Sequence, residues 1–101
     1  MTPLDIKKIA TGFRKGFLGK NPSSGQCFVL SVSLQGYLDF MGCKTDLIEG
    51  GIRDTDWNHF WLRLPDGTII DPTADQFNGF DGLPKMPRIY IGPKPEHYEV
   101  A

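Results

Sequence analysis

The segment from residue 58 to residue 71 constrains the fold more than any other part of the chain. It contains two short runs, Asn58–Leu64 and Thr68–Asp71, joined by Pro65-Asp66-Gly67. Apolar and polar residues alternate in the first run, as they do in a strand with one buried face. Pro, Asp and Gly in this order favour a type I turn followed by a left-handed glycine, which makes a three-residue hairpin loop with a bulge. The segment therefore predicts an antiparallel hairpin.

This turn also determines which side chains share a face. In a three-residue hairpin Leu64 pairs with Thr68, and the same register sets Trp61 opposite Asp71. His59 then lies diagonal to Asp71, with about 7–8 Å between the Cα atoms, which is within reach of a contact between imidazole and carboxylate. A two-residue loop would shift the register by one and turn Asp71 to the opposite face. The predicted turn is thus a condition for a His59–Asp71 pair.

Two helices are predicted before the hairpin. The first begins with Thr2 as N-cap, Pro3 at the first helical position and an acid at Asp5. Its apolar stripe at helical spacing comprises Ile6, Ile9, Ala10, Phe13 and Phe17. The second runs from about Gly25 to Met41, with Ser23 or Ser24 as its cap and Gly42 at its end, and its buried face comprises Leu30, Leu34, Tyr37, Leu38 and Met41.

Two further strands and an extended tail complete the prediction. We expect one strand from Thr45 to Ile48, stopping at Gly50-Gly51, and a last strand from Arg88 to Ile91. The tail, residues 92–101, is rich in proline, so it is extended and either covers an edge strand, binds a partner or lies across a cleft. Helices followed by an antiparallel sheet indicate an α+β fold with N-terminal helices packed on a small sheet, in one domain over residues 1–101.

A His–Asp pair is half of a nucleophilic arrangement, and Cys27 is the best candidate for the other half. Cys27 lies at the predicted N-terminal turn of the second helix, where the partial positive charge of the helix favours thiolate over thiol. Gly25 allows the backbone to bend sharply there, and the Cys27 amide is a possible oxyanion donor. Cys43 has no such placement and is expected to be a small buried apolar residue.

Three segments resemble the motifs of the transglutaminase-like superfamily, which has a papain-like fold. They are GQCF at residues 25–28, HFW at residues 59–61 and DPTADQF at residues 71–77, so the resemblance covers roughly residues 22–77 and is strongest for small bacterial members. It implies a minimal core with Cys27 as nucleophile, His59 as general base and acid, and Asp71 as the residue that orients the imidazole. Two features depart from the family pattern, namely the bulky Val29-Leu30 after Phe28 and the short chain.

Other residues are candidates for supporting roles. Gln26, Asn21 and Gln76 are the alternatives for the second oxyanion donor, with Gln26 slightly favoured because it immediately precedes the cysteine. Trp61, next but one to the histidine, is a packing residue that also screens an ion pair from water. Asp54 and Asp56 are expected to be solvated in a polar loop.

Composition excludes several classes of function. The net charge of −1 and the lack of a Lys/Arg cluster along the sequence argue against nucleic acid as a partner. No apolar run is long enough to cross a membrane, and the charged N-terminus does not have the pattern of a signal peptide, so we expect a cytoplasmic protein, although export without such a peptide remains open. Cys27, Cys43, His59 and His97 lack the close pairing of zinc ligands, and neither a metal nor a cofactor is expected.

The expected function is thiol-dependent acyl transfer on amide bonds of a protein or peptide. Hydrolysis is the default, which makes the protein a peptidase, an amidase or a glutamine deamidase. Transfer to an amine, as in a transglutaminase, is the alternative, and a non-catalytic binding module that keeps the fold is the third possibility.

Overall fold

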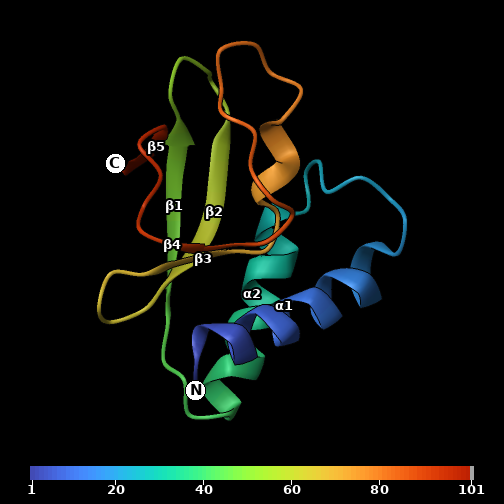
Figure 1. Ribbon diagram of the computed structural model, residues 1–101, viewed down its shortest axis with the longest axis vertical. Helices are drawn as coiled ribbons and strands as arrows, with labels where there is room; N and C mark the ends of the chain where they lie inside the picture. Colours follow the sequence, from blue (N-terminus) through green and yellow to red (C-terminus); the bar gives the residue numbers. More distant parts are fainter. Residues whose placement is uncertain (101) are drawn as a thin grey trace.

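The protein folds into two helices packed against a small, curled, antiparallel five-stranded sheet, so the predicted α+β class is confirmed (Figure 1). The structure is a computed structural model that describes residues 1–100; of the predicted domain and tail, only residue 101 lies outside it. The elements are α1 Pro3–Leu18, α2 Cys27–Phe40, β1 Asp46–Ile52, β2 Asn58–Arg63, β3 Ile69–Asp71, the 3-10 helix η1 Ala74–Phe77, β4 Tyr90–Gly92 and β5 Tyr98–Val100. The strand order is β4-β3-β2-β1-β5.

Helix α1 begins as its sequence predicts. The Thr2 side chain accepts a hydrogen bond from the Asp5 amide, and the Asp5 carboxylate accepts one from the Thr2 amide, which is a capping box. Ile6 and Ala10 of its apolar stripe are buried, whereas Phe17 at the end is half exposed. The N-terminal half of the stripe therefore attaches α1 to the core.

Helix α2 differs from the prediction at its start. The N-cap is Gln26, which makes no side-chain cap hydrogen bond, and the predicted cap Ser23 instead donates from Oγ to Asp75 at 2.8 Å. The prediction of a serine cap was therefore wrong, because a partner 52 residues away competes for the hydroxyl. At the other end, Gly42 has a φ of +84° and follows the last turn as predicted.

The sheet contains the predicted hairpin in the predicted register. Leu62 pairs with Ile70 and Arg63 with Ile69. The Leu64 amide donates to the Thr68 carbonyl at 2.8 Å, and Gly67 has a φ of +91°, as a three-residue loop with a glycine bulge requires. The strands β3 and β4 turn away from the direction of β1 and β2, which curls the sheet (Figure 1).

Strand β1 is longer than the sequence indicates, because it continues through Gly50 and Gly51 to Ile52. Gly50 pairs with His59 on one side and with Val100 on the other. A Cβ atom at Gly50 would lie 2.3 Å from the ring of Trp61 and 2.3 Å from the Glu99 carbonyl oxygen. Position 50 therefore requires glycine because no side chain fits between the Trp61 ring and β5. Gly50 does not end the strand.

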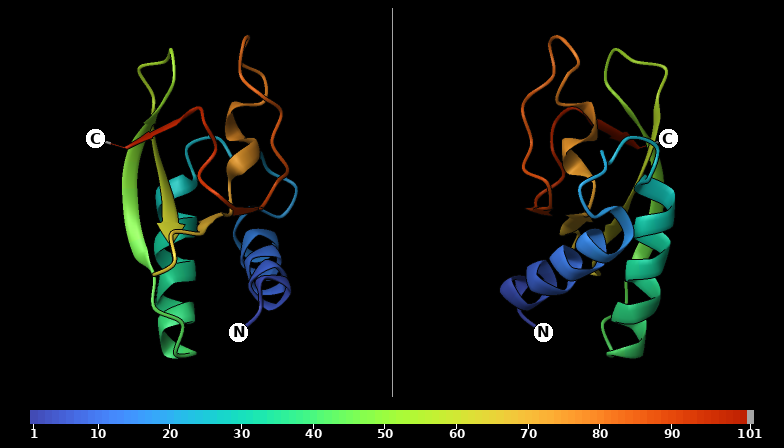
Figure 2. Two further views of the ribbon diagram at one scale, coloured as in Figure 1. Left: turned by 60° about the vertical axis from the view of Figure 1, so that its left-hand side comes forward. Right: turned by 90° about the vertical axis from the view of Figure 1, so that its right-hand side faces the viewer.

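Two apolar clusters form the core. One joins the helices to the sheet and contains Ile6, Ala10, Leu34, Leu38, Leu62, Ile70 and Ile89. The other contains Ile52, Trp61, Ile69, Phe77 and Tyr98. Leu62 and Trp61 thus lie in different clusters, as their alternation along β2 predicts. Helix α2 lies along the β1–β2 hairpin, α1 crosses α2, and η1 stands beside the N-terminal end of α2 (Figure 2).

Candidate active site

The hairpin brings His59 and Asp71 into direct contact. Nε2 of His59 lies 2.6 Å from Oδ2 of Asp71, and both residues are fully buried. The contact depends on the three-residue loop, since the observed register sets both side chains on one face. The predicted His59–Asp71 pair is therefore present in the structure.

The start of α2 brings the Cys27 thiol close enough to the His59 imidazole for the two groups to interact. Gly25 has a φ of +76°, so the chain bends sharply just before Cys27 opens the helix. The next residues fix α2 on β2, because the rings of Phe28 and Phe60 are 4.9 Å apart and Oγ of Ser31 donates to the Phe60 carbonyl. Cys27 is 8% exposed, whereas the His–Asp pair has no exposed surface. Cys27 is thus the only one of the three residues with any exposed surface.

The thiol and the imidazole shift each other's proton affinity. Burial lowers the pKa of His59, but the hydrogen bond to Asp71 and the neighbouring Cys27 outweigh this and raise it to about 9. Burial raises the pKa of Cys27, but His59 and the backbone of Phe60 reverse this and lower it. Nδ1 of His59, the nitrogen not bonded to Asp71, is buried without a partner in hydrogen-bonding geometry among residues 1–100. Both shifts favour the thiolate–imidazolium pair over the neutral thiol and imidazole.

Tyr98 is a member of the site that the sequence analysis missed. Its hydroxyl donates to Oδ2 of Asp71 at 2.5 Å, so tyrosine and histidine share one carboxylate oxygen. The other oxygen, Oδ1, accepts hydrogen bonds from the amide and the hydroxyl of Thr73. Tyr98 is delivered by β5, which pairs with β1 and brings Tyr98 opposite Ile52. Of the alternatives for the tail, the structure therefore shows that it covers an edge strand.

Removing the tyrosine hydroxyl should change the proton affinity of the histidine. In Tyr98→Phe, Oδ2 of Asp71 interacts with the imidazolium alone, so we expect the pKa of His59 to rise above about 9. An NMR titration of the His59 ring measures this without any substrate. Tyr90→Phe is the matched control, because it removes a tyrosine hydroxyl that donates to the Pro93 carbonyl and makes no hydrogen bond to Asp71. An unchanged titration in Tyr98→Phe would show that the tyrosine only fills space.

A second, partly buried network ties the segments around the site together. Arg14 of α1 makes a bidentate ion pair with Asp75 of η1 at 2.7 and 2.8 Å. Asp75 also accepts from Ser23, in the loop before Cys27. Burial raises the pKa of Asp75, but Arg14 and Ser23 outweigh this and lower it. The network joins α1 to the loop that precedes Cys27 and to η1, which follows Asp71. The local sequence does not reveal that these charges pair, because Arg14 and Asp75 are 61 residues apart.

The oxyanion candidates are placed differently. Gln26 lies next to Cys27 as the N-cap of α2. Gln76 lies on η1, adjacent to Phe77, whose ring packs 5.1 Å from that of His59, and its Oε1 is buried without a partner among the described residues. Asn21 is exposed in the loop after α1. The choice between these donors stays a prediction.

Aromatic side chains surround the histidine and continue to the surface. Trp61 is fully buried, with its ring 5.8 Å from that of His59. The ring of Phe77 also packs against that of Phe80, with 5.4 Å between the ring centroids, and the ring of Phe80 packs against that of Trp57, with 6.1 Å between the centroids. Trp57 is 55% exposed, in the loop between β1 and β2. Aromatic rings thus separate the buried His59–Asp71 pair from solvent, and the outermost of these rings, those of Phe80 and Trp57, are partly exposed.

Within residues 1–100, no group of three or more His, Cys, Asp or Glu side chains is arranged to hold a metal ion. No helix of the described chain has both the length and the apolar character needed to cross a membrane. Comparison of the chain with models of known families, with curated proteins and with solved structures gives no match. The resemblance to the transglutaminase-like superfamily therefore depends on the three motifs alone.

Proposed function

We propose that the protein is a thiol-dependent acyl-transfer enzyme of transglutaminase-like type that acts on amide bonds of a protein or peptide. The observation that carries the proposal is that His59 interacts with both Asp71 and Cys27, with the pKa of the thiol lowered and that of the imidazole raised. Cys27 is nucleophile, His59 acid and base, and Asp71 the residue that orients the imidazole.

The first half of the reaction forms a thioester. The Cys27 thiolate attacks the amide carbonyl carbon, and the carbonyl electrons move to oxygen, which becomes an oxyanion near the start of α2. The Cys27 amide is one donor to this oxyanion, and Gln26 or Gln76 is the second. Collapse of the oxyanion breaks the C–N bond, and the imidazolium of His59 gives its proton to the leaving nitrogen. Amine or ammonia leaves, and the acyl group remains on sulfur.

The second half regenerates the thiol. Neutral His59 takes a proton from water, the hydroxide adds to the thioester carbonyl, and the C–S bond breaks to give a carboxylic acid and the free enzyme. Hydrolysis is the simpler proposal, because water requires no second binding site. An amine in place of water would give the transglutaminase reaction by the same steps.

Mass spectrometry of glutamine-containing peptides incubated with the protein tests the proposal. Conversion of a side-chain amide to an acid indicates a deamidase, a cut backbone indicates a peptidase, and an amine adduct indicates transfer. Cys27→Ala must abolish the product, whereas Cys43→Ala, which removes the other free cysteine, must not. No product from any peptide, together with an unreactive Cys27, would support the non-catalytic binding module instead.

A further inference from the structure

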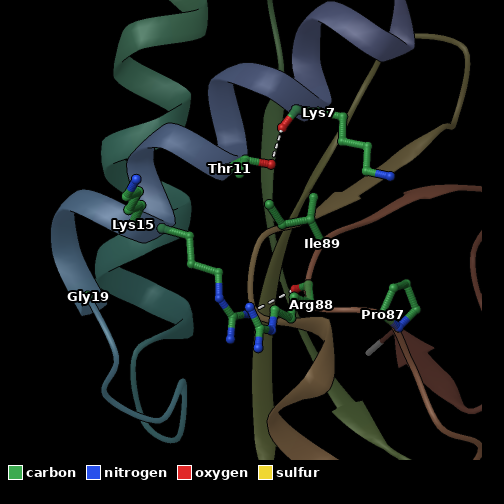
Figure 3. Close-up of a pocket in the computed structure, with 8 residues that line it drawn as sticks. Lys7, Thr11, Lys15, Gly19, Pro87, Arg88 and Ile89 are labelled. Atoms are coloured by element: carbon green, nitrogen blue, oxygen red, sulfur yellow. Dashed lines mark hydrogen bonds between the residues drawn. The ribbon is translucent and has the colours of Figure 1, made fainter.

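A basic cavity lies away from the candidate active site, between α1 and the segment before β4 (Figure 3). Its volume is about 520 Å³, and its lining does not include Cys27, His59 or Asp71. The lining residues are Lys7, Thr11, Arg14, Lys15, Gly19, Pro87, Arg88 and Ile89. Sequence analysis found no Lys/Arg cluster, because Arg88 joins the α1 residues only in the folded chain.

The positive charge of this cavity is only partly balanced. Four of the eight lining residues are cationic and none is acidic. Arg14 is neutralised by Asp75, and its guanidinium also donates to the backbone carbonyl of Arg88. Lys7, Lys15 and Arg88 form no salt bridge within the described part of the chain. Three unpaired cations therefore border one hollow in a chain whose net charge is −1.

The arrangement follows from helix geometry and one long-range contact. Lys7, Thr11 and Lys15 are spaced four residues apart, so they lie along one face of α1. Arg88 is held opposite this face by the hydrogen bond from Arg14 to its carbonyl, which leaves its own guanidinium free of that bond. Like charges around a concave surface repel one another and concentrate positive potential in the hollow. A bound anion would relieve this repulsion.

We propose that this cavity binds a small molecule that carries phosphate groups. A phosphate group bears about two negative charges near neutral pH and offers several acceptor oxygens. The planar fork of Arg88 suits two of these oxygens, and Lys7 and Lys15, which line the cavity from two different turns of α1, add positive charge on either side. Ile89 and Pro87 give the same cavity an apolar wall for the rest of the ligand. The volume lies within the range of small-molecule sites, roughly 300–1,000 Å³.

The size of the cavity favours a compact ligand over a nucleic-acid backbone. A phosphate backbone is bound along an extended groove, whereas Lys7, Lys15 and Arg88 all line one cavity of about 520 Å³. The proposal is independent of the proposed acyl-transfer function, since it uses none of the triad residues. Its test can therefore fail or succeed whether or not Cys27 is reactive.

Isothermal titration calorimetry with pyrophosphate, at constant ionic strength, tests the proposal on the full chain. We expect saturable binding that is at least tenfold weaker in Lys7→Gln/Lys15→Gln/Arg88→Gln. The matched control is Lys8→Gln/Lys20→Gln/Lys85→Gln, which removes the same charge from outside the cavity and should bind like the wild type. In NMR spectra, the amides of Thr11 and Ile89 should shift with pyrophosphate.

Each other outcome overturns the proposal. Equal loss of binding in both triple variants would show that pyrophosphate responds to the overall charge of the protein and not to this cavity. Tight binding of citrate without binding of pyrophosphate would replace phosphate by carboxylate as the ligand class, and binding of single-stranded DNA without binding of pyrophosphate would indicate a backbone surface. If the cavity triple variant does not fold, the single variant Arg88→Gln tests the proposal. It should fold, because the Arg88 side chain is exposed and only the Arg88 backbone bonds to Arg14. Wild-type affinity in that folded variant would contradict the assignment.

Discussion

Asp71→Asn should lower kcat/KM by about a thousand- to ten-thousand-fold while the protein remains folded. Nε2–H of His59 donates a hydrogen bond to Oδ2 of the Asp71 carboxylate, with 2.6 Å between nitrogen and oxygen, and this bond raises the pKa of the imidazole. An asparagine amide has nearly the same shape but no charge, so it neither stabilises the imidazolium nor fixes the tautomer that presents Nδ1 to the thiol. Turnover of an amide substrate and the thermal unfolding midpoint, measured together, separate the two effects.

The control for this variant is Asp46→Asn. Asp46 is exposed at the start of β1 and pairs only with Arg63, at 3.4 Å, so its replacement should leave turnover unchanged. Full activity in Asp71→Asn would remove Asp71 from the catalytic group. A large loss of activity accompanied by unfolding would leave its catalytic role to be judged from the titration of His59.

Gly50→Ala should cost about 3 kcal/mol of unfolding free energy, at the upper end of typical overpacking effects. The new Cβ would meet the Trp61 ring and the Glu99 carbonyl oxygen, both at 2.3 Å, so β5 must move away from β1. The midpoint of thermal unfolding should fall by more than about 10 °C for a chain of this length. Because β5 carries Tyr98, its displacement should also remove the hydroxyl from Asp71.

Gly51→Ala is the matched control, because its Cβ would meet only the Trp57 carbonyl, at 4.0 Å. Both glycines lie in β1, so the two variants share the same loss of backbone freedom in the unfolded state. Equal stability of the two variants would contradict the close approach of β1, Trp61 and β5 at Gly50.

The parts of the fold that local chemistry determines were predicted from the sequence. The Pro65-Asp66-Gly67 turn sets the register of the hairpin, and the register sets His59 beside Asp71. The capping box of Thr2 and Asp5 fixes the start of α1 in the same way. These features depend on residues at most a few positions from a turn or a helix end, so spacing alone reveals them.

The parts that depend on distant partners could not be predicted. Ser23 is of a residue type that often caps helices, but its hydroxyl donates to Asp75, which also accepts from Arg14. Gly50 reads as a strand end, but the ring of Trp61 and a strand from the tail require a glycine there. Tyr98 lies in a short proline-rich tail without a strand pattern, and only pairing with β1 brings it to Asp71. Local propensity carries no information on such contacts.

The rate of alkylation of Cys27 by iodoacetamide at pH 6, with Cys43 as the internal reference, tests the central claim most directly. If Cys27, His59 and Asp71 act as one relay, the lowered pKa of Cys27 gives it a larger thiolate fraction at this pH than an ordinary thiol has, and peptide mapping should show it labelled at least about tenfold faster than Cys43. His59→Ala should abolish the difference. Equally slow labelling of both cysteines in the folded wild-type protein, or fast labelling that His59→Ala leaves unchanged, would contradict the account.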